Sequence, residues 1–197
     1  MHLSVDWDNI EDLRRFDRAV KVLGSNMLRT VAPRALNRTG QMARTQVVRS
    51  LAKQTGLKQK VIRKAVRTRS AFVSGAGDSL SFDLMTRGGE VGLIHLSPKE
   101  VEGGTVAMPF GKRTLYPEAF FRGGVFPGRR VMLRGKPRVM VRKGEDRLPI
   151  MKARSGVWIP KEMLQGDTAD AFTRTVAQVL PRRLMHEVGR LTGGVLS

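Results

Sequence analysis

Between Arg29 and Arg69 the sequence contains no aspartate or glutamate, although lysine and arginine recur throughout that stretch. Like charges at close range repel, so a folded domain normally interleaves both signs. A stretch of this kind predicts an acidic partner outside the chain, either nucleic acid or an acidic protein surface. It favours a role in binding or assembly over small-molecule catalysis.

Other absences narrow the possibilities further. The chain has no cysteine, which excludes disulfides, thiol catalysis and cysteine-based metal sites. Aromatic residues make up 6 % and are nearly missing from the basic runs, which argues against a platform for stacking single-stranded bases. No run approaches the roughly 20 apolar residues of a membrane helix. The acidic first residues are unlike a secretion signal. We therefore expect no membrane partner.

The overall balance is strongly basic but compatible with a folded core. The formal net charge is +19, the sequence pI is near 11.5, and hydrophobic residues make up 41 % of the 197 residues. That length suits one domain, or a body with arms. Residues 1–17 are acidic and precede the basic block. This order indicates either head-to-tail contact between copies or acids in the first turn of a helix.

Helical periodicity dominates the first third of the chain. We expect a helix over residues 9–30, interrupted at Pro33, and a second helix from there to about residue 54, ended by Gly56. A shorter helix should follow over 58–66. On the second helix one apolar stripe faces inward, namely Leu36, Ala43, Val47 and Leu51. A different arc of the same helix carries Arg34, Arg38, Arg49 and Lys53.

After Arg67 apolar residues alternate and glycines become frequent, which is typical of strands. Strands are expected at 80–85, 91–96, 106–110, 131–133, 139–141, 150 and 157–159. The chain closes in a helix that starts at Asp167 or Thr168 and is kinked or broken at Pro181. The fold class is α+β, with N-terminal basic helices, a central antiparallel twisted sheet or small barrel, and a C-terminal helix packed on it. The expected segments are 1–70, 71–161 and 162–197, within one structural domain.

Residues that could support catalysis are scattered. His2, His95 and His186 lack metal-ligand spacing, and no nucleophile elbow, phosphate loop or dinucleotide motif occurs. Asp167 and Asp170 fit the acidic start of a helix. We therefore expect no enzyme activity, no catalytic residue, no metal and no cofactor.

The candidate contact residues are the cations of the acid-free stretch. They are Arg34, Arg38, Arg44, Arg49, Lys53, Lys58, Lys60, Arg63 and Lys64. A secondary basic surface is expected from Arg129, Arg130, Arg134, Lys136 and Arg138. Such runs are either solvated faces or polyanion contacts. As contacts they would bind the duplex backbone without reading sequence, or bind acidic neighbouring proteins.

Short motifs in a fixed order carry a family resemblance. They are Ala35-Leu36-Asn37-Arg38, Thr55-Gly56-Leu57-Lys58, Pro117-Glu118-Ala119-Phe120, Leu148-Pro149-Ile150, and Val157 to Pro160 followed by the helix through Pro181. In this order, over residues 10 to 192, the chain resembles the bacteriophage minor tail protein Z family of tail-completion proteins. Residues 97–114 match nothing in that family.

The resemblance implies a structural virion protein that completes the head-proximal end of a phage tail and joins it to the head. It implies no enzyme activity. The implied partners are other copies in a ring, six by analogy, together with the tail terminator, the head–tail connector and genomic double-stranded DNA. The implied location is the virion, after assembly in the bacterial cytoplasm. Asn37, in the Asn-Arg step, is expected to form a local hydrogen bond. The alternative function is a cellular DNA- or RNA-binding protein without sequence preference.

Overall fold

The computed structural model describes residues 1–6, 25–73, 80–129, 131–133, 135 and 137–191. Its helices and antiparallel strands confirm the predicted α+β class. The chain forms two compact units. The first unit comprises Met1–Ser50, Val66–Arg87 and Met163–Ser197, and the second comprises Leu51–Ala65 and Gly88–Glu162. The segment boundary expected near residue 161 lies next to the unit boundary at Glu162–Met163, whereas no unit boundary falls at residue 70, because the chain enters the second unit twice.

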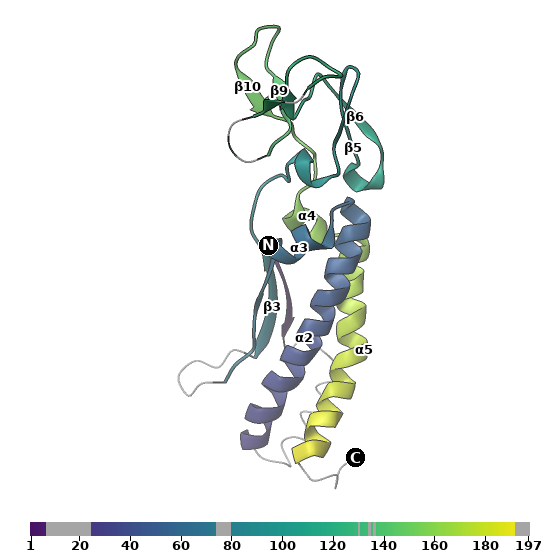
Figure 1. Ribbon diagram of the computed structural model, residues 1–197. Helices are drawn as coiled ribbons and strands as arrows, with labels where there is room; N and C mark the ends of the chain where they lie inside the picture. Colours follow the sequence, from purple (N-terminus) through teal and green to yellow (C-terminus); the bar gives the residue numbers. More distant parts are fainter. Residues whose placement is uncertain (7–24, 74–79, 130, 134, 136, 192–197) are drawn as a thin grey trace. The chain divides into compact units, whose positions relative to one another are not determined.

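The first unit combines two long helices with a small sheet. Helix α2 (Ser25–Thr55, its first part in this unit) and helix α5 (Gly166–Leu191) run side by side in opposite directions (Figure 1). Strands β1 (His2–Asp6), β3 (Ser81–Thr86) and β2 (Val66–Arg69) form an antiparallel sheet in the order β1-β3-β2. Burial alternates along β3, which is typical of a strand with one covered face.

The apolar stripes of both helices build the core of this unit. Leu36, Ala43 and Val47 of α2 are fully buried, as the periodicity predicted. On α5 the buried side chains recur at helical spacing, at Phe172, Val176, Leu180, Leu184 and Val188. Leu191, at the end of α5, is exposed. From the sheet, Val5, Val66, Phe82 and Leu84 add to the core.

The two helix-interior prolines do not end their helices. The prediction that Pro33 interrupts the first helical segment is wrong, because α2 continues through it. Helix α5 likewise continues through Pro181. A proline inside a helix costs about 3 kcal/mol through its missing N–H and its ring. Burial of the neighbours Ala32 and Leu36, and of Leu180 beside Pro181, offsets that cost by removing apolar surface from water.

The second unit is built from short strands and turns. Strands β4 (Lys99–Val101), β5 (Gly104–Ala107) and β6 (Thr114–Pro117) form one antiparallel sheet. Two further antiparallel pairs are β7 (Arg122–Gly123) with β8 (Val131–Met132), and β9 (Met140–Arg142) with β10 (Ile150–Lys152). Within the described residues, the strands are thus divided among four small sheets.

Helical segments complete the second unit. Helix α3 (Gln59–Ala65) confirms the short helix expected over 58–66, and its Ile62 is fully buried. Helix α4 (Ile159–Met163) lies near the end of the unit. Gly56 ends α2 as predicted. Its φ of 74° favours glycine, and a Cβ there would overlap the carbonyl oxygen of Met108.

Two of the expected strands are not formed. Residues Leu93–His95 form a 3-10 helix where a strand over 91–96 was expected. Leu93 and Leu96 are both buried, and a 3-10 turn brings residues three apart onto one side, whereas a strand would separate them. The strand expected at 157–159 is also wrong. Ile159 begins α4 with Pro160 next, a position where proline is favoured because its missing N–H needs no partner.

The N-terminal prediction is only partly covered by the structure. Residues 7–24 of the expected helix 9–30 lie outside the described residues. Strand β1 was not predicted from the sequence, although Leu3 and Val5 alternate with polar residues as in a strand. Its register pairs Val5 with Phe82, so the start of the chain forms one edge of the sheet.

Candidate polyanion-binding surface

Three arginines of α2 form an exposed basic face in the first unit. Arg34, Arg38 and Arg49 are exposed, while Leu36, on the opposite arc of the helix, is fully buried. The predicted separation of a basic arc from an apolar arc is therefore confirmed. Arg34 and Arg38 are one helical turn apart, so their Cα atoms are separated by about 6 Å along the axis.

No carboxylate neutralises this α2 basic face (Arg34, Arg38 and Arg49) within the part of the chain that the structure describes. The ion pairs found there join Arg129 to Glu100, Arg154 to Glu90 and Arg190 to Glu187. The face also has no exposed aromatic ring, so its contacts with a ligand would be electrostatic. An arrangement of this kind suits phosphate groups at any base sequence.

Arg44 has a different role from the exposed cations. It is half-buried, and its Nη2 donates a hydrogen bond of 3.3 Å to the carbonyl oxygen of Val66 at the start of β2. On a helical wheel Arg44 falls in the arc of the core residues. Arg44 was a candidate contact in the sequence, but its hydrogen bond joins helix α2 to the sheet.

Asn37 also connects the helix to a distant segment. Its Nδ2 donates to the carbonyl oxygen of Ala71 at 2.9 Å, and its Oδ1 accepts the N–H of Ala71 at 2.8 Å. The expectation of a hydrogen-bonding residue is confirmed, but the expectation of a local bond is wrong, since the partner lies 34 residues away. The two bonds together satisfy the backbone N–H and C=O of Ala71, which follows β2.

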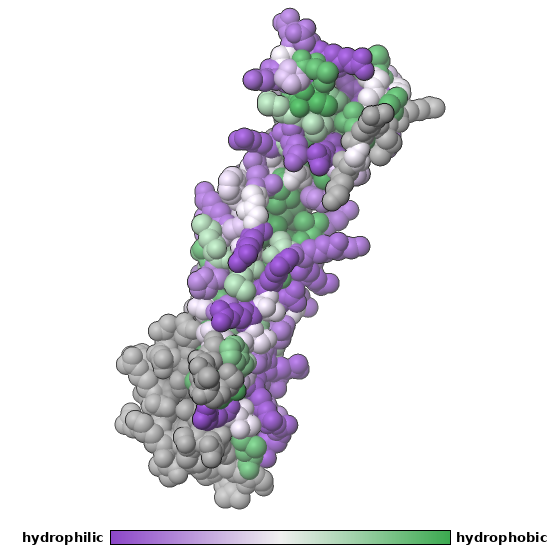
Figure 2. All heavy atoms as spheres, turned by 90° about the vertical axis from the view of Figure 1, so that its left-hand side faces the viewer, coloured by the Kyte–Doolittle hydropathy of each residue, from purple (hydrophilic) through white to green (hydrophobic). Residues whose placement is uncertain are grey.

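The second unit carries its own cluster of exposed cations. Five of the predicted contact residues are exposed there, namely Lys53, Lys58, Lys60, Arg63 and Lys64. Arg63 donates a hydrogen bond of 2.9 Å from Nη2 to Oε1 of Gln59. Ile62 is the buried residue of this short helix, so most of its surface is polar. Figure 2 shows hydrophilic side chains projecting over much of one face, with apolar side chains in small separate patches.

Only two residues of the predicted secondary basic surface, Arg129 and Arg138, lie in the part of the chain that the structure describes. Arg129 is half-buried, pairs with Oε1 of Glu100 at 3.7 Å, and lies over the ring of Phe120 at 5.8 Å. The charge of Arg129 is therefore balanced largely within the second unit, by the Glu100 carboxylate and the Phe120 ring. Arg138 is exposed. Arg130, Arg134 and Lys136 lie outside the described residues.

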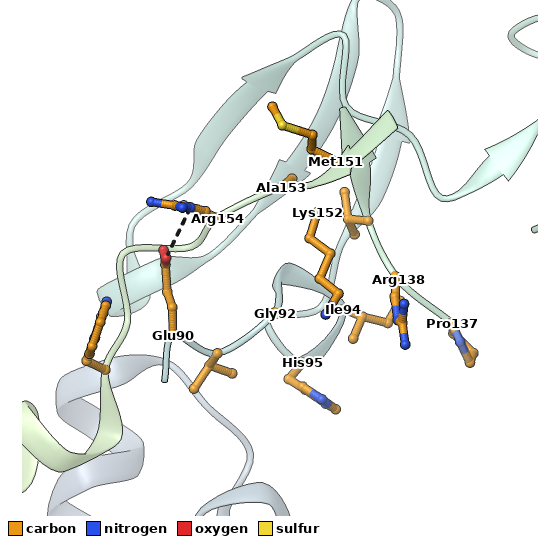
Figure 3. Close-up of a pocket in the computed structure, with 13 residues that line it drawn as sticks. Glu90, Gly92, Ile94, His95, Pro137, Arg138, Met151, Lys152, Ala153 and Arg154 are labelled. Atoms are coloured by element: carbon orange, nitrogen blue, oxygen red, sulfur yellow. Dashed lines mark ion pairs between the residues drawn. The ribbon is translucent and has the colours of Figure 1, made fainter. Parts of the chain in front are cut away.

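An apolar groove in the second unit was not expected from the sequence. Its volume is about 1090 Å³. It is lined by three stretches of chain, residues 90–95, 137–139 and 151–158. Figure 3 shows Arg154 facing Glu90, with Arg138 and His95 on the side of the groove away from that pair. No motif marks this groove in the sequence, because its walls come from segments that are far apart along the chain.

The described titratable side chains include three exposed histidines, a buried glutamate and a half-buried tyrosine. His2, His95 and His186 are exposed, and the described residues contain no group of three His, Cys, Asp or Glu side chains placed to hold a metal. Buried Glu162 accepts a hydrogen bond of 2.7 Å from Gln54. Partial burial raises the pKa of the Tyr116 hydroxyl, and the negative charge of Glu90 raises it further. Tyr116 lies on β6, outside the lining of the groove.

Comparisons with models of known families, with curated proteins and with solved structures find no match for this chain. The resemblance to the minor tail protein Z family therefore depends on the residues quoted for it. Among the described helices, none combines the length and apolar character needed to cross a membrane.

Proposed function

We propose that this chain is a non-enzymatic structural protein of a tailed bacteriophage, which binds a polyanion while completing the head-proximal end of the tail and joining it to the head. The observation that carries the proposal is the α2 basic face. Arg34, Arg38 and Arg49 are exposed on a helix whose surroundings, within the described residues, offer them no carboxylate. The order of the motifs that resemble the minor tail protein Z family supports the proposal that the protein belongs to a phage tail.

The proposed ligand is the backbone of double-stranded DNA. Exposed arginines one helical turn apart suit phosphate oxygens, which arginine binds with two parallel hydrogen bonds. Without base contacts, affinity should not depend on sequence. In the virion we propose a ring of copies, six by analogy with the family, next to the tail terminator and the head–tail connector. Acidic residues 1–17 of one copy would then meet basic residues of the next.

A DNA titration tests the ligand. Arg34→Gln/Arg38→Gln should lower the slope of log affinity against log salt by about 1.8, because each lost phosphate contact removes about 0.9. Two unrelated duplexes should bind alike. The matched control is Lys143→Gln/Arg147→Gln, which removes the same charge from an exposed loop. If the control lowers the slope as much, the binding reflects net charge alone and the α2 face is not the contact.

A particle experiment tests the virion role separately. Phage particles assembled without this chain should have defective tails or heads without tails in negative-stain images. Normal, infectious particles would contradict the proposal, as would a single asymmetric copy for the ring. The cellular alternative is favoured by the same α2 face, and it predicts salt-sensitive DNA binding by a chain that does not purify with tails. An acidic protein partner predicts that added DNA competes poorly.

A further inference from the structure

The groove in the second unit differs chemically from the α2 basic face. Its floor contains apolar side chains, and two of them remain unusually open to solvent. Trp158 is 48 % exposed and Met151 is 46 % exposed. Exposed large apolar residues gathered in a hollow are a common sign of a protein contact. A phosphate backbone would gain nothing from this apolar surface.

The walls of the groove are held by hydrogen bonds within the unit. The N–H of Val91 donates to the carbonyl oxygen of Val157 at 2.9 Å, and the N–H of Ala153 donates to that of Val139 at 3.0 Å. An isolated antiparallel bridge joins Gly92 to Arg154. The groove is thus formed before any ligand arrives, which reduces the entropy lost on binding.

The charge of the groove is positive. Arg138, Lys152 and Arg154 line it, against the single carboxylate of Glu90. Glu90 already accepts the N–H of Gly156 and lies 4.0 Å from Nε of Arg154. Arg138 and Lys152 remain as exposed cations beside the apolar floor. Their ligand should therefore carry negative charge next to an apolar group.

We propose that this groove is a docking site for an acidic peptide segment of another protein, anchored by a bulky apolar side chain against Trp158 and Met151. The inference goes beyond the proposed function, which depends on α2. A second copy is the competing occupant, because its residues 6–17 are themselves acidic and contain bulky apolar side chains, and the test below distinguishes it from another protein. The apolar anchor provides affinity by leaving water, and the cations select an acidic partner.

Fluorescence anisotropy on the full chain tests the site. The probe is a labelled peptide about 12 residues long, of alternating glutamate and leucine with one central tryptophan. Arg138→Gln/Lys152→Gln should weaken binding about tenfold. Trp158→Ala should weaken it about tenfold as well. Lys143→Gln/Arg147→Gln, outside the groove, should change it less than about twofold. Met151→Ala serves as a second test of the anchor if Trp158→Ala changes the circular dichroism spectrum.

Four further ligands test the chemistry of the contact and the identity of the occupant. A peptide with glutamine for glutamate, and one with alanine for leucine and tryptophan, should both bind at least about tenfold more weakly. Loss of affinity in the charge variants without any loss in Trp158→Ala and Met151→Ala would overturn the proposal, because the contact would then be electrostatic alone. A peptide of residues 6–17 that binds more tightly than the probe would overturn it in favour of a second copy. If duplex DNA, added at the same total negative charge as the probe peptide, displaces the probe, the groove binds DNA instead.

Discussion

Replacing Gly40 by alanine tests the contact between helix α2 and the sheet in the first unit. In most helices this change stabilises the fold by about 1 kcal/mol, because alanine has the higher helix propensity. Here a Cβ at position 40 would overlap Cγ, Cδ1 and Cε1 of Phe82, a fully buried side chain on β3. The helix can approach the strand this closely only because position 40 has no side chain.

The expected net effect is destabilisation. Forcing an extra methyl group into a packed core costs about 1–3 kcal/mol. Subtracting the gain in helix propensity leaves a loss of up to about 2 kcal/mol. For a chain of this length that corresponds to a fall in Tm of about 2–4 °C per kcal/mol. Thermal unfolding followed by circular dichroism at 222 nm measures it.

A control and a second substitution make the test specific. Thr45→Ala lies on the exposed arc of the same helix, where the gain in propensity should raise Tm or leave it unchanged. Phe82→Leu, which removes the ring, should make Gly40→Ala less harmful than it is in the original background. If Gly40→Ala raises Tm as Thr45→Ala does, the close packing of α2 on Phe82 is refuted.

Two further predictions concern single side chains. Asn37→Ala should cost about 1–3 kcal/mol in the free energy of unfolding, because both backbone groups of Ala71 lose their partners; Gln41→Ala, exposed on the same helix, should cost within about 0.5 kcal/mol, and equal effects would contradict the role of Asn37. Tyr116 is the only tyrosine, so absorbance at 295 nm during a pH titration should show its ionisation above the ordinary pKa of 10.0. Because the folded state favours the neutral phenol, its contribution to stability is full below the unfolded pKa and is lost as the pH rises through the folded pKa. Glu90→Gln should lower the folded pKa only in part, since burial is the larger cause, and an unshifted midpoint in the unaltered chain would contradict the burial of Tyr116.

Periodicity in the sequence predicted the features that depend on one element alone. The spacing of Leu36, Ala43 and Val47 identified the buried arc of α2, and the same spacing placed Arg34 and Arg38 on the exposed arc. These predictions succeed because a helix fixes the direction of each side chain from its position in the chain. Gly56 ended the helix as expected for the same local reason.

Features that depend on distant segments were not predictable in this way. Pro33 looked like an interruption because the packing that offsets its cost comes from other parts of the first unit. The residues of the groove carry no motif in the sequence, and they form a groove only when three segments meet. In the sequence Arg44 and Arg129 could not be told apart from the other cations. The partner of Arg44 is Val66, 22 residues away, and Arg129 contacts Glu100 and Phe120 only through the fold.

The acid-free stretch is compatible with folding because its charges are placed where repulsion is weak. Two unit charges about 6 Å apart in water repel by about 0.7 kcal/mol, and physiological salt reduces this further because its screening length is about 8 Å. Arg34 and Arg38 are exposed to water, so their mutual repulsion is weak and screened in this way. Arg44 is half-buried, and its guanidinium donates a hydrogen bond to the carbonyl oxygen of Val66. Arg34 and Arg38 therefore cost the fold little, yet neither is paired with a described carboxylate. A phosphate backbone would bring two negative charges to this pair at once, and for that reason the α2 basic face is the part of the first unit most suited to a partner outside the chain.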